Sequence, residues 1–149
     1  MYSYWDPPQP LTSTLAASGW SVQTWANASV RAGFPSPAED HQVERIDLMK
    51  QLIRHPQATF LLRVRGDSMK DAGILDGSVV LVDKAIRAAS GHIVIAVVDG
   101  EFTCKTLVRQ AGHLRLQAAH PDYDDIVPTD GQTLEIWGVV VASIHQHVR

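Results

Sequence analysis

Short apolar runs of strand-forming residues alternate with turn signals from residue 58 onward. The clearest example is HIVIAVV (92–98) followed by EFTCKTLV (101–108), because the intervening Asp99-Gly100 is a strong signal for a tight β-hairpin. Four more strands are expected, at residues 58–64, 78–83, 113–118 and 133–145. This succession predicts a compact, mostly β domain built of short strands.

One short helix is expected before these strands, in IDLMKQLIRHP (46–56). Asp47 can cap its N-terminus and Pro56 can end it. Its apolar face would be supplied by Ile46, Met49, Leu52 and Ile53. Two prolines in GFPSP (33–37) predict a stiff, extended connector ahead of the helix.

Residues 1–32 differ in composition from the rest of the chain. Their only charged side chains are Asp6 and Arg31, and no clear helical or strand period runs through them. Three of the four tryptophans lie here: Trp5, Trp20 and Trp25. Tryptophans can bury a large area against a partner surface, whereas disordered tails are usually poor in aromatic residues. We therefore interpret the segment as an extended N-terminal arm that docks on a folded body, with a disordered tail as the alternative.

The overall composition limits the classes of protein that fit. With 149 residues, 45% hydrophobic and 19% charged, the chain is long enough for one globular domain with a real core. It has no run of roughly eighteen apolar residues that could span a membrane, and its N-terminus does not have the pattern of a secretory signal. The single cysteine, Cys104, excludes an internal disulfide and fits a reducing, cytoplasmic compartment. The net charge of −3 argues against a protein that works by binding phosphates.

Two residues in the β region could carry chemistry. Ser68 lies in RVRGDSMKDAG (63–73), directly after a predicted strand, but glycine, aspartate and serine also favour ordinary turns. Lys105 lies in mid-strand, where alternation places it on the same face as Thr103 and Leu107. Burial would lower its pKa, and a neutral amine near Ser68 could take the hydroxyl proton. The residue pattern alone leaves two alternatives open, a turn serine and an edge-strand lysine that guards against aggregation.

The seven histidines do not form a recognisable site. None of them sits in a pattern that indicates a catalytic triad. His145 and His147 could lie on one side of a strand, but a metal site needs more ligands, and a solvated tail is the favoured interpretation. We therefore expect neither a metal nor another cofactor.

Several phrases resemble the UmuD branch of the LexA-like self-cleaving serine peptidases. They are GFPSPAED (33–40), IDLMKQLIRHPQATF (46–60), GDSMKDAGILDG (66–77), GHIVIAVVDGEFT (91–103), DGEFTCKTL (99–107) and IWGVV (136–140). The similarity covers residues 33–149 almost without a gap. Cys104 is a departure, since the UmuD pattern often has valine there, and residues 1–31 match nothing that can be placed. The resemblance implies a compact, mostly β domain that works as a homodimer.

The resemblance also implies roles for individual residues. By position in the motifs, Ser68 is the nucleophile and Lys105 the general base of a Ser-Lys serine endopeptidase. The family cuts its own chain before a glycine, typically after alanine or cysteine, which here implies the Ala32–Gly33 bond. That bond lies at the boundary between the N-terminal arm (1–32) and the expected peptidase domain (33–149).

The functional expectation is a protein of the SOS response. The resemblance implies that a RecA filament on single-stranded DNA stimulates self-cleavage, and that the trimmed dimer joins a UmuC-type translesion DNA polymerase. Direct sequence-specific DNA binding is not expected, because residues 1–32 cannot supply the helix-turn-helix of a LexA-type or phage-type repressor. A signal peptidase also uses serine and lysine, but the membrane anchor it needs is missing from the pattern. A catalytically silent accessory subunit stays open as an alternative.

Overall fold

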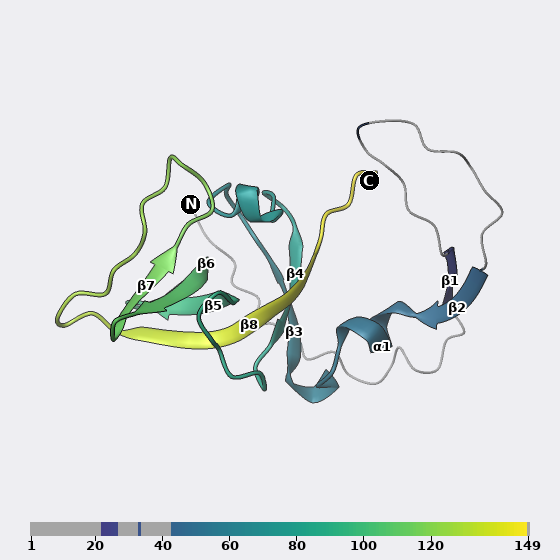
Figure 1. The fold of residues 1–149 in the computed structure, drawn as a ribbon, viewed down its shortest axis with the longest axis horizontal. Helices are drawn as coiled ribbons and strands as arrows, with labels where there is room; N and C mark the ends of the chain where they lie inside the picture. Colours follow the sequence, from purple (N-terminus) through teal and green to yellow (C-terminus); the bar gives the residue numbers. More distant parts are fainter. Residues whose placement is uncertain (1–21, 27–32, 34–42, 149) are drawn as a thin grey trace. The chain divides into compact units, whose positions relative to one another are not determined.

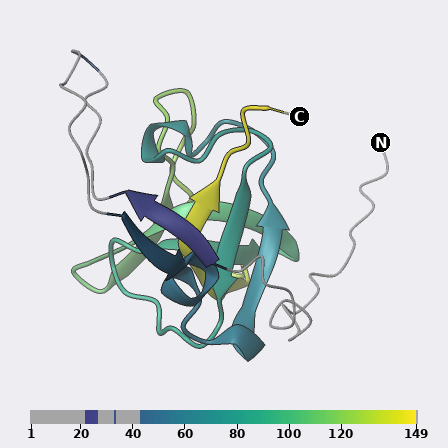
Figure 2. The same ribbon diagram turned by 90° about the vertical axis from the view of Figure 1, so that its right-hand side faces the viewer.

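The computed structural model describes residues 22–26, 33 and 43–148. Contacts divide this part of the chain into two units, which separate between Arg54 and His55. Figures 1 and 2 show both units in colours that follow the sequence. No helix among the described residues is long and apolar enough to cross a membrane.

The first unit contains a two-stranded ribbon and one short helix (Figure 1). β1 (Val22–Ala26) pairs with β2 (Val43–Asp47) in an antiparallel register. The sequence shows no clear strand period in residues 1–32, and β1 nevertheless forms within this segment. Strand formation depends on the partner strand, here well separated along the chain, more than on local propensity.

Of the three arm tryptophans that are predicted to dock, the structure describes the backbone of one. Trp5 and Trp20 lie outside the described residues. Trp25 belongs to β1, where its backbone lies opposite Glu44 of β2. The docking of the three indole side chains on the body stays a prediction.

α1 (Leu48–Leu52) is the predicted helix in a shorter form. Asp47 caps it as expected, since Asp47 Oδ1 accepts a hydrogen bond from the Lys50 N–H at 3.1 Å. The helix gives way to extended backbone at Ile53, before Pro56, and the proline instead opens a short 3₁₀ turn. The predicted apolar face is half-buried along its length, at Ile46, Met49, Leu52 and Ile53.

Six antiparallel strands form the second unit, and all six were predicted from the sequence. They are β3 (Thr59–Arg63), β4 (Val79–Asp83), β5 (Ile93–Val98), β6 (Glu101–Gln110), β7 (His113–Gln117) and β8 (Leu134–Ile144). Their order in the sheet is β3-β4-β8-β5-β6-β7, so the last strand of the chain lies in the middle (Figure 2). The prediction of a mostly β fold is confirmed.

The β5–β6 hairpin sets the position of the predicted lysine. Asp99 and Gly100 have φ values of 49° and 83°, the left-handed pair that a two-residue hairpin turn of the favoured type requires. Val98 therefore lies opposite Glu101, and the same register brings Lys105 opposite Val94. β6 also pairs with β7 on its other side, so it is an internal strand of the sheet.

Two apolar clusters make up the core, and consecutive residues of β5 contribute to each in turn. Ile95 belongs to the cluster of Met69, Ile74, Val80, Val82 and Ile95. Val94 and Ala96 belong to the cluster of Val94, Ala96, Leu107, Leu116 and Val139. The strand alternation read from the sequence therefore describes how this sheet buries both of its faces.

Gly138 on β8 tests how closely the strands pack. A Cβ atom at this position would lie 2.6 Å from Val82 Cγ1 and 3.4 Å from the carbonyl oxygen of Asp83. Gly138→Ala should lower the free energy of unfolding by about 1–3 kcal/mol, as overpacking of a core typically does. In a Val82→Ala background the loss should be smaller, because Cγ1 is gone, and urea unfolding of the four proteins measures both costs. Equal costs in the two backgrounds would show that the contact does not limit packing.

Candidate active site

Ser68 lies in a tight turn between β3 and a short 3₁₀ segment (Lys70–Ala72). Gly66, at φ 90°, lets the chain reverse, and its N–H donates to Asp76 Oδ1 at 2.7 Å. Met69, directly after the serine, is only 1% exposed and anchors the turn in the core. The serine itself is half-buried, and its position is held from both sides.

Lys105 reaches this turn from β6. Its Nζ lies 2.8 Å from Ser68 Oγ, 3.2 Å from Thr103 Oγ1 and 3.1 Å from the carbonyl oxygen of Cys104. The side chain is 7% exposed, and β6 is an internal strand, so the edge-strand alternative for Lys105 is wrong. The two residues singled out from the sequence are therefore brought into direct contact.

The surroundings of Lys105 favour its neutral form. Burial lowers the pKa of Lys105 from its usual value of 10.5, and the charge interaction with Cys104 opposes this shift. No carboxylate among the described residues forms an ion pair with this amine to restore the charge. Once neutral, the amine can accept the hydroxyl proton of Ser68 across the same 2.8 Å contact.

Thr103 is a site residue whose role the sequence pattern did not reveal. Its hydroxyl is one of the three groups that hold the Lys105 amine. Strand alternation had placed Thr103 and Lys105 on one face, so a signal was present. What the pattern could not show is that the lysine side chain bends back to the threonine, since side-chain conformation is set by the packing around it.

The backbone of Ala119 is the second contact that no motif indicated. The Ala119 N–H donates to the carbonyl oxygen of Ser68 at 2.7 Å, and the Asp71 N–H donates to the carbonyl oxygen of Ala119 at 2.8 Å. These two hydrogen bonds hold the nucleophile turn at Ser68 itself and three residues after it, at Asp71. The segment after β7 that carries Ala119 shows no strand or helix pattern, so only the three-dimensional structure reveals the contact.

Two predicted features stay outside the site. Ala32 lies outside the described residues, and Gly33 is described as exposed in the first unit, so the Ala32–Gly33 bond is not located relative to Ser68. The rings of His145 and His147 lie edge to face at 5.3 Å, with His145 Nδ1 at 3.4 Å from Ser78 Oγ. The described residues contain no group of three or more side chains arranged to hold a metal ion.

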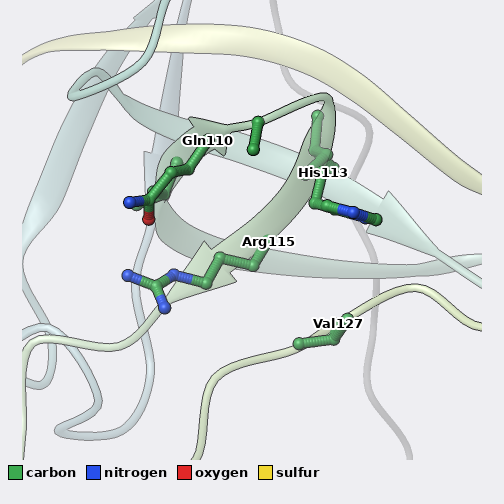
Figure 3. Close-up of a pocket in the computed structure, with 7 residues that line it drawn as sticks. Gln110, His113, Arg115 and Val127 are labelled. Carbon is green, nitrogen blue, oxygen red and sulfur yellow. The ribbon is translucent and has the colours of Figure 1, made fainter.

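A cavity of about 340 Å³ lies elsewhere on the second unit. Gln110, His113 and Arg115 of the β6–β7 hairpin line it, together with Val127 from the segment that follows β7 (Figure 3). Neither Ser68 nor Lys105 contributes to its wall. The cavity is therefore separate from the serine and lysine.

Cys104 should be an unreactive thiol although it adjoins Lys105. Burial raises the pKa of Cys104 to about 11, against a smaller lowering by the Lys105 charge, so the thiol stays protonated at pH 8. Iodoacetamide should alkylate it slowly in the native protein and far faster in concentrated urea, which mass spectrometry over time can follow. Similar rates in both conditions would mean that the thiol is not shielded by the fold.

Comparison with known proteins places the chain in a family. A family profile described as Peptidase S24-like matches residues 24–141, a stretch that includes both Ser68 and Lys105. The chain is 39% identical to protein MucA of Salmonella typhimurium over 120 residues, which make up 79% of this chain and 81% of MucA. It is 46% identical to protein SamA of Salmonella typhimurium (strain LT2) over 115 residues, or 77% of this chain and 79% of SamA.

A repressor is also among the relatives. The chain is 43% identical to the LexA repressor of Azoarcus sp. (strain BH72) over 116 residues, which cover 77% of this chain and 57% of the repressor. MucA and SamA are thus matched over most of their length, whereas the repressor is matched over little more than half. The family match and these identities confirm the resemblance in the motifs: the chain belongs to the Peptidase S24-like family, as a UmuD-like member of the LexA and UmuD group.

Proposed function

We propose that the protein is a serine peptidase of the SOS response that cuts its own chain, with Ser68 as nucleophile and Lys105 as general base. The observation that carries the proposal is the 2.8 Å contact between Lys105 Nζ and Ser68 Oγ at a buried amine. A serine hydroxyl is a weak nucleophile until an adjacent base takes its proton. A neutral lysine can fill that role, as it does in Ser-Lys variants of the catalytic triad.

The proposed reaction is an acyl transfer at the Ala32–Gly33 bond. Neutral Lys105 takes the hydroxyl proton while Ser68 Oγ forms a bond to the carbonyl carbon of Ala32, which gives a tetrahedral intermediate. The intermediate collapses, the C–N bond to Gly33 breaks, and the lysine returns the proton to the leaving amine. Water then hydrolyses the ester on Ser68, again with Lys105 as base, and the free serine is restored.

Four features support the choice of bond. Alanine is small enough for a tight pocket, and glycine lets the backbone bend sharply at the point of attack. The bond lies where the composition of the chain changes from the arm (1–32) to the body (33–149). It also lies in the connection between the paired strands β1 and β2, so the strands bracket it on both sides.

The proposed partners follow from the relatives. We infer a homodimer that is stimulated to cleave by a RecA filament on single-stranded DNA and then joins a UmuC-type translesion DNA polymerase in the cytoplasm. The similarity to MucA, SamA and the protein ImpA of Salmonella typhimurium supports this inference. Exposed apolar side chains on β3 and β8, at Leu61, Val141 and Ile144, offer surface that a dimer could bury.

Replacement of the serine tests the proposal directly. Purified full-length protein at alkaline pH should release a fragment that begins at Gly33, whereas Ser68→Ala should release none and lose less than about 1 kcal/mol of stability. Ser143→Ala, an exposed serine on β8, is the matched control and should cleave as the wild type does. Mass spectrometry of the products identifies the new N-terminus. A different N-terminus would assign the cleavage to another bond, and a wild-type protein that never cleaves would favour the catalytically silent accessory subunit.

The pH dependence tests the lysine. Below the pKa of Lys105 the amine is protonated and cannot act as a base, so the wild-type rate should rise with pH and level off below pH 10.5, because burial lowers that pKa. Lys105→Ala should not cleave, and Lys105→Arg should not rescue it, since arginine stays protonated. Lys84→Ala, an exposed lysine, should keep the wild-type profile. A rate that is flat from neutral to alkaline pH would remove Lys105 from the role of base.

A further inference from the structure

Residues 118–125, which we call the β7 loop, run from the end of β7 back to its edge. A two-way backbone bridge closes the base of this loop: the Leu116 N–H donates to the Ile126 carbonyl at 2.9 Å, and the Ile126 N–H donates to the Leu116 carbonyl at 2.8 Å. Leu116 is fully buried in the core. The loop is therefore anchored to the sheet at both of its ends.

The middle of the β7 loop holds the nucleophile turn. Ala119 uses both its N–H and its carbonyl, toward the Ser68 carbonyl at 2.7 Å and the Asp71 N–H at 2.8 Å. Its side chain packs against the core cluster that contains Met69. Among the described residues, no other backbone N–H donates to the carbonyl of Ser68.

Asp125 links Ala118, the residue before Ala119, to strand β7. Its Oδ1 accepts a hydrogen bond from the Ala118 N–H at 3.3 Å, and its Oδ2 lies 3.6 Å from Arg115 Nε on β7. Ala118 is the immediate neighbour of Ala119, so the carboxylate fixes the loop one residue away from the group that holds Ser68. Asp125 itself contacts neither Ser68 nor Lys105, and any effect on them must pass through the loop backbone.

We propose that Asp125 is a positioning residue of the Ser68–Lys105 site. The carboxylate holds Ala118, Ala119 holds the Ser68 carbonyl, and Ser68 Oγ stays within hydrogen-bond distance of Lys105 Nζ. This inference rests on the proposed function, because it assigns Asp125 a part in activating the serine. Proton transfer needs heavy atoms about 2.6–3.2 Å apart, and a shift of about 1 Å can cost about a hundredfold in rate.

The test measures the reactivity of Ser68 toward a small external probe, so that the Ala32–Gly33 bond is not the substrate. A fluorophosphonate probe reacts with activated serines: the serine oxygen bonds to phosphorus, fluoride leaves, and the hydroxyl proton passes to the base. Full-length protein is labelled over a range of pH, and the fraction of labelled Ser68 is followed by mass spectrometry. Self-cleavage of the same samples is measured in parallel.

The variants separate the hydrogen bond from the charge. Asp125→Ala should lower the maximal labelling and cleavage rates by between about tenfold and a hundredfold. Asp125→Asn keeps an Oδ1 acceptor for Ala118 and should stay within about threefold of wild type. The midpoint of the pH profile should not move, because the burial of Lys105 and its three partners are unchanged. Asp124→Ala removes an exposed neighbouring carboxylate and is the matched control.

Several outcomes would overturn the inference. A folded Asp125→Ala protein that is labelled at the wild-type rate would show that the loop does not position Ser68. If Asp125→Ala does not fold, amide hydrogen exchange of the wild type decides: the Ala119 N–H should be protected, and fast exchange would contradict its bond to Ser68. A wild-type protein that is not labelled at Ser68 would overturn the proposed function and this inference with it. A labelling defect confined to Asp125→Ala leaves the proposed function standing, so the two results can be told apart.

Discussion

The burial of one amine is the constraint on which the rest of the site depends. A protonated lysine is costly to remove from water, and Lys105 is 7% exposed with no carboxylate partner among the described residues. Its nitrogen instead lies within hydrogen-bond distance of three oxygen atoms, those of the Ser68 hydroxyl, the Thr103 hydroxyl and the Cys104 carbonyl. This arrangement requires an internal strand for the lysine and a rigid turn for the serine, and the sheet and the β7 loop supply them.

Much of the sheet could be predicted because its signals are local. Asp99-Gly100 adopts the two left-handed conformations that its residue types favour, and the hairpin register that follows brings Lys105 opposite Val94. The contact between Ser68 and Lys105 was expected from the family resemblance and not from spacing, since no local rule brings together residues so far apart in the chain. The short Leu48–Leu52 helix and its Asp47 cap could also be predicted. The end of the helix before Ile53 could not.

Several features that could not be predicted depend on contacts that form only when the chain folds. β1 has no strand period of its own and forms against β2, and the β7 loop has no pattern until Ala119 meets the Ser68 turn. In the sequence, Asp125 is one of several acidic residues near a proline, and nothing singles it out. Its contact with the Ala118 N–H comes from the closure of the loop at Leu116 and Ile126.

The ribbon of β1 and β2 has a consequence for what a cut between them would accomplish. While the chain is intact, the two strands are held at the high effective concentration that a covalent connection provides. Scission at the proposed bond would leave the strands paired only through their own backbone ladder, and an isolated two-stranded ribbon is marginally stable in water. Departure of the N-terminal piece would then become a bimolecular equilibrium, sensitive to dilution, and the completion of the switch would be set by dissociation as well as by chemistry.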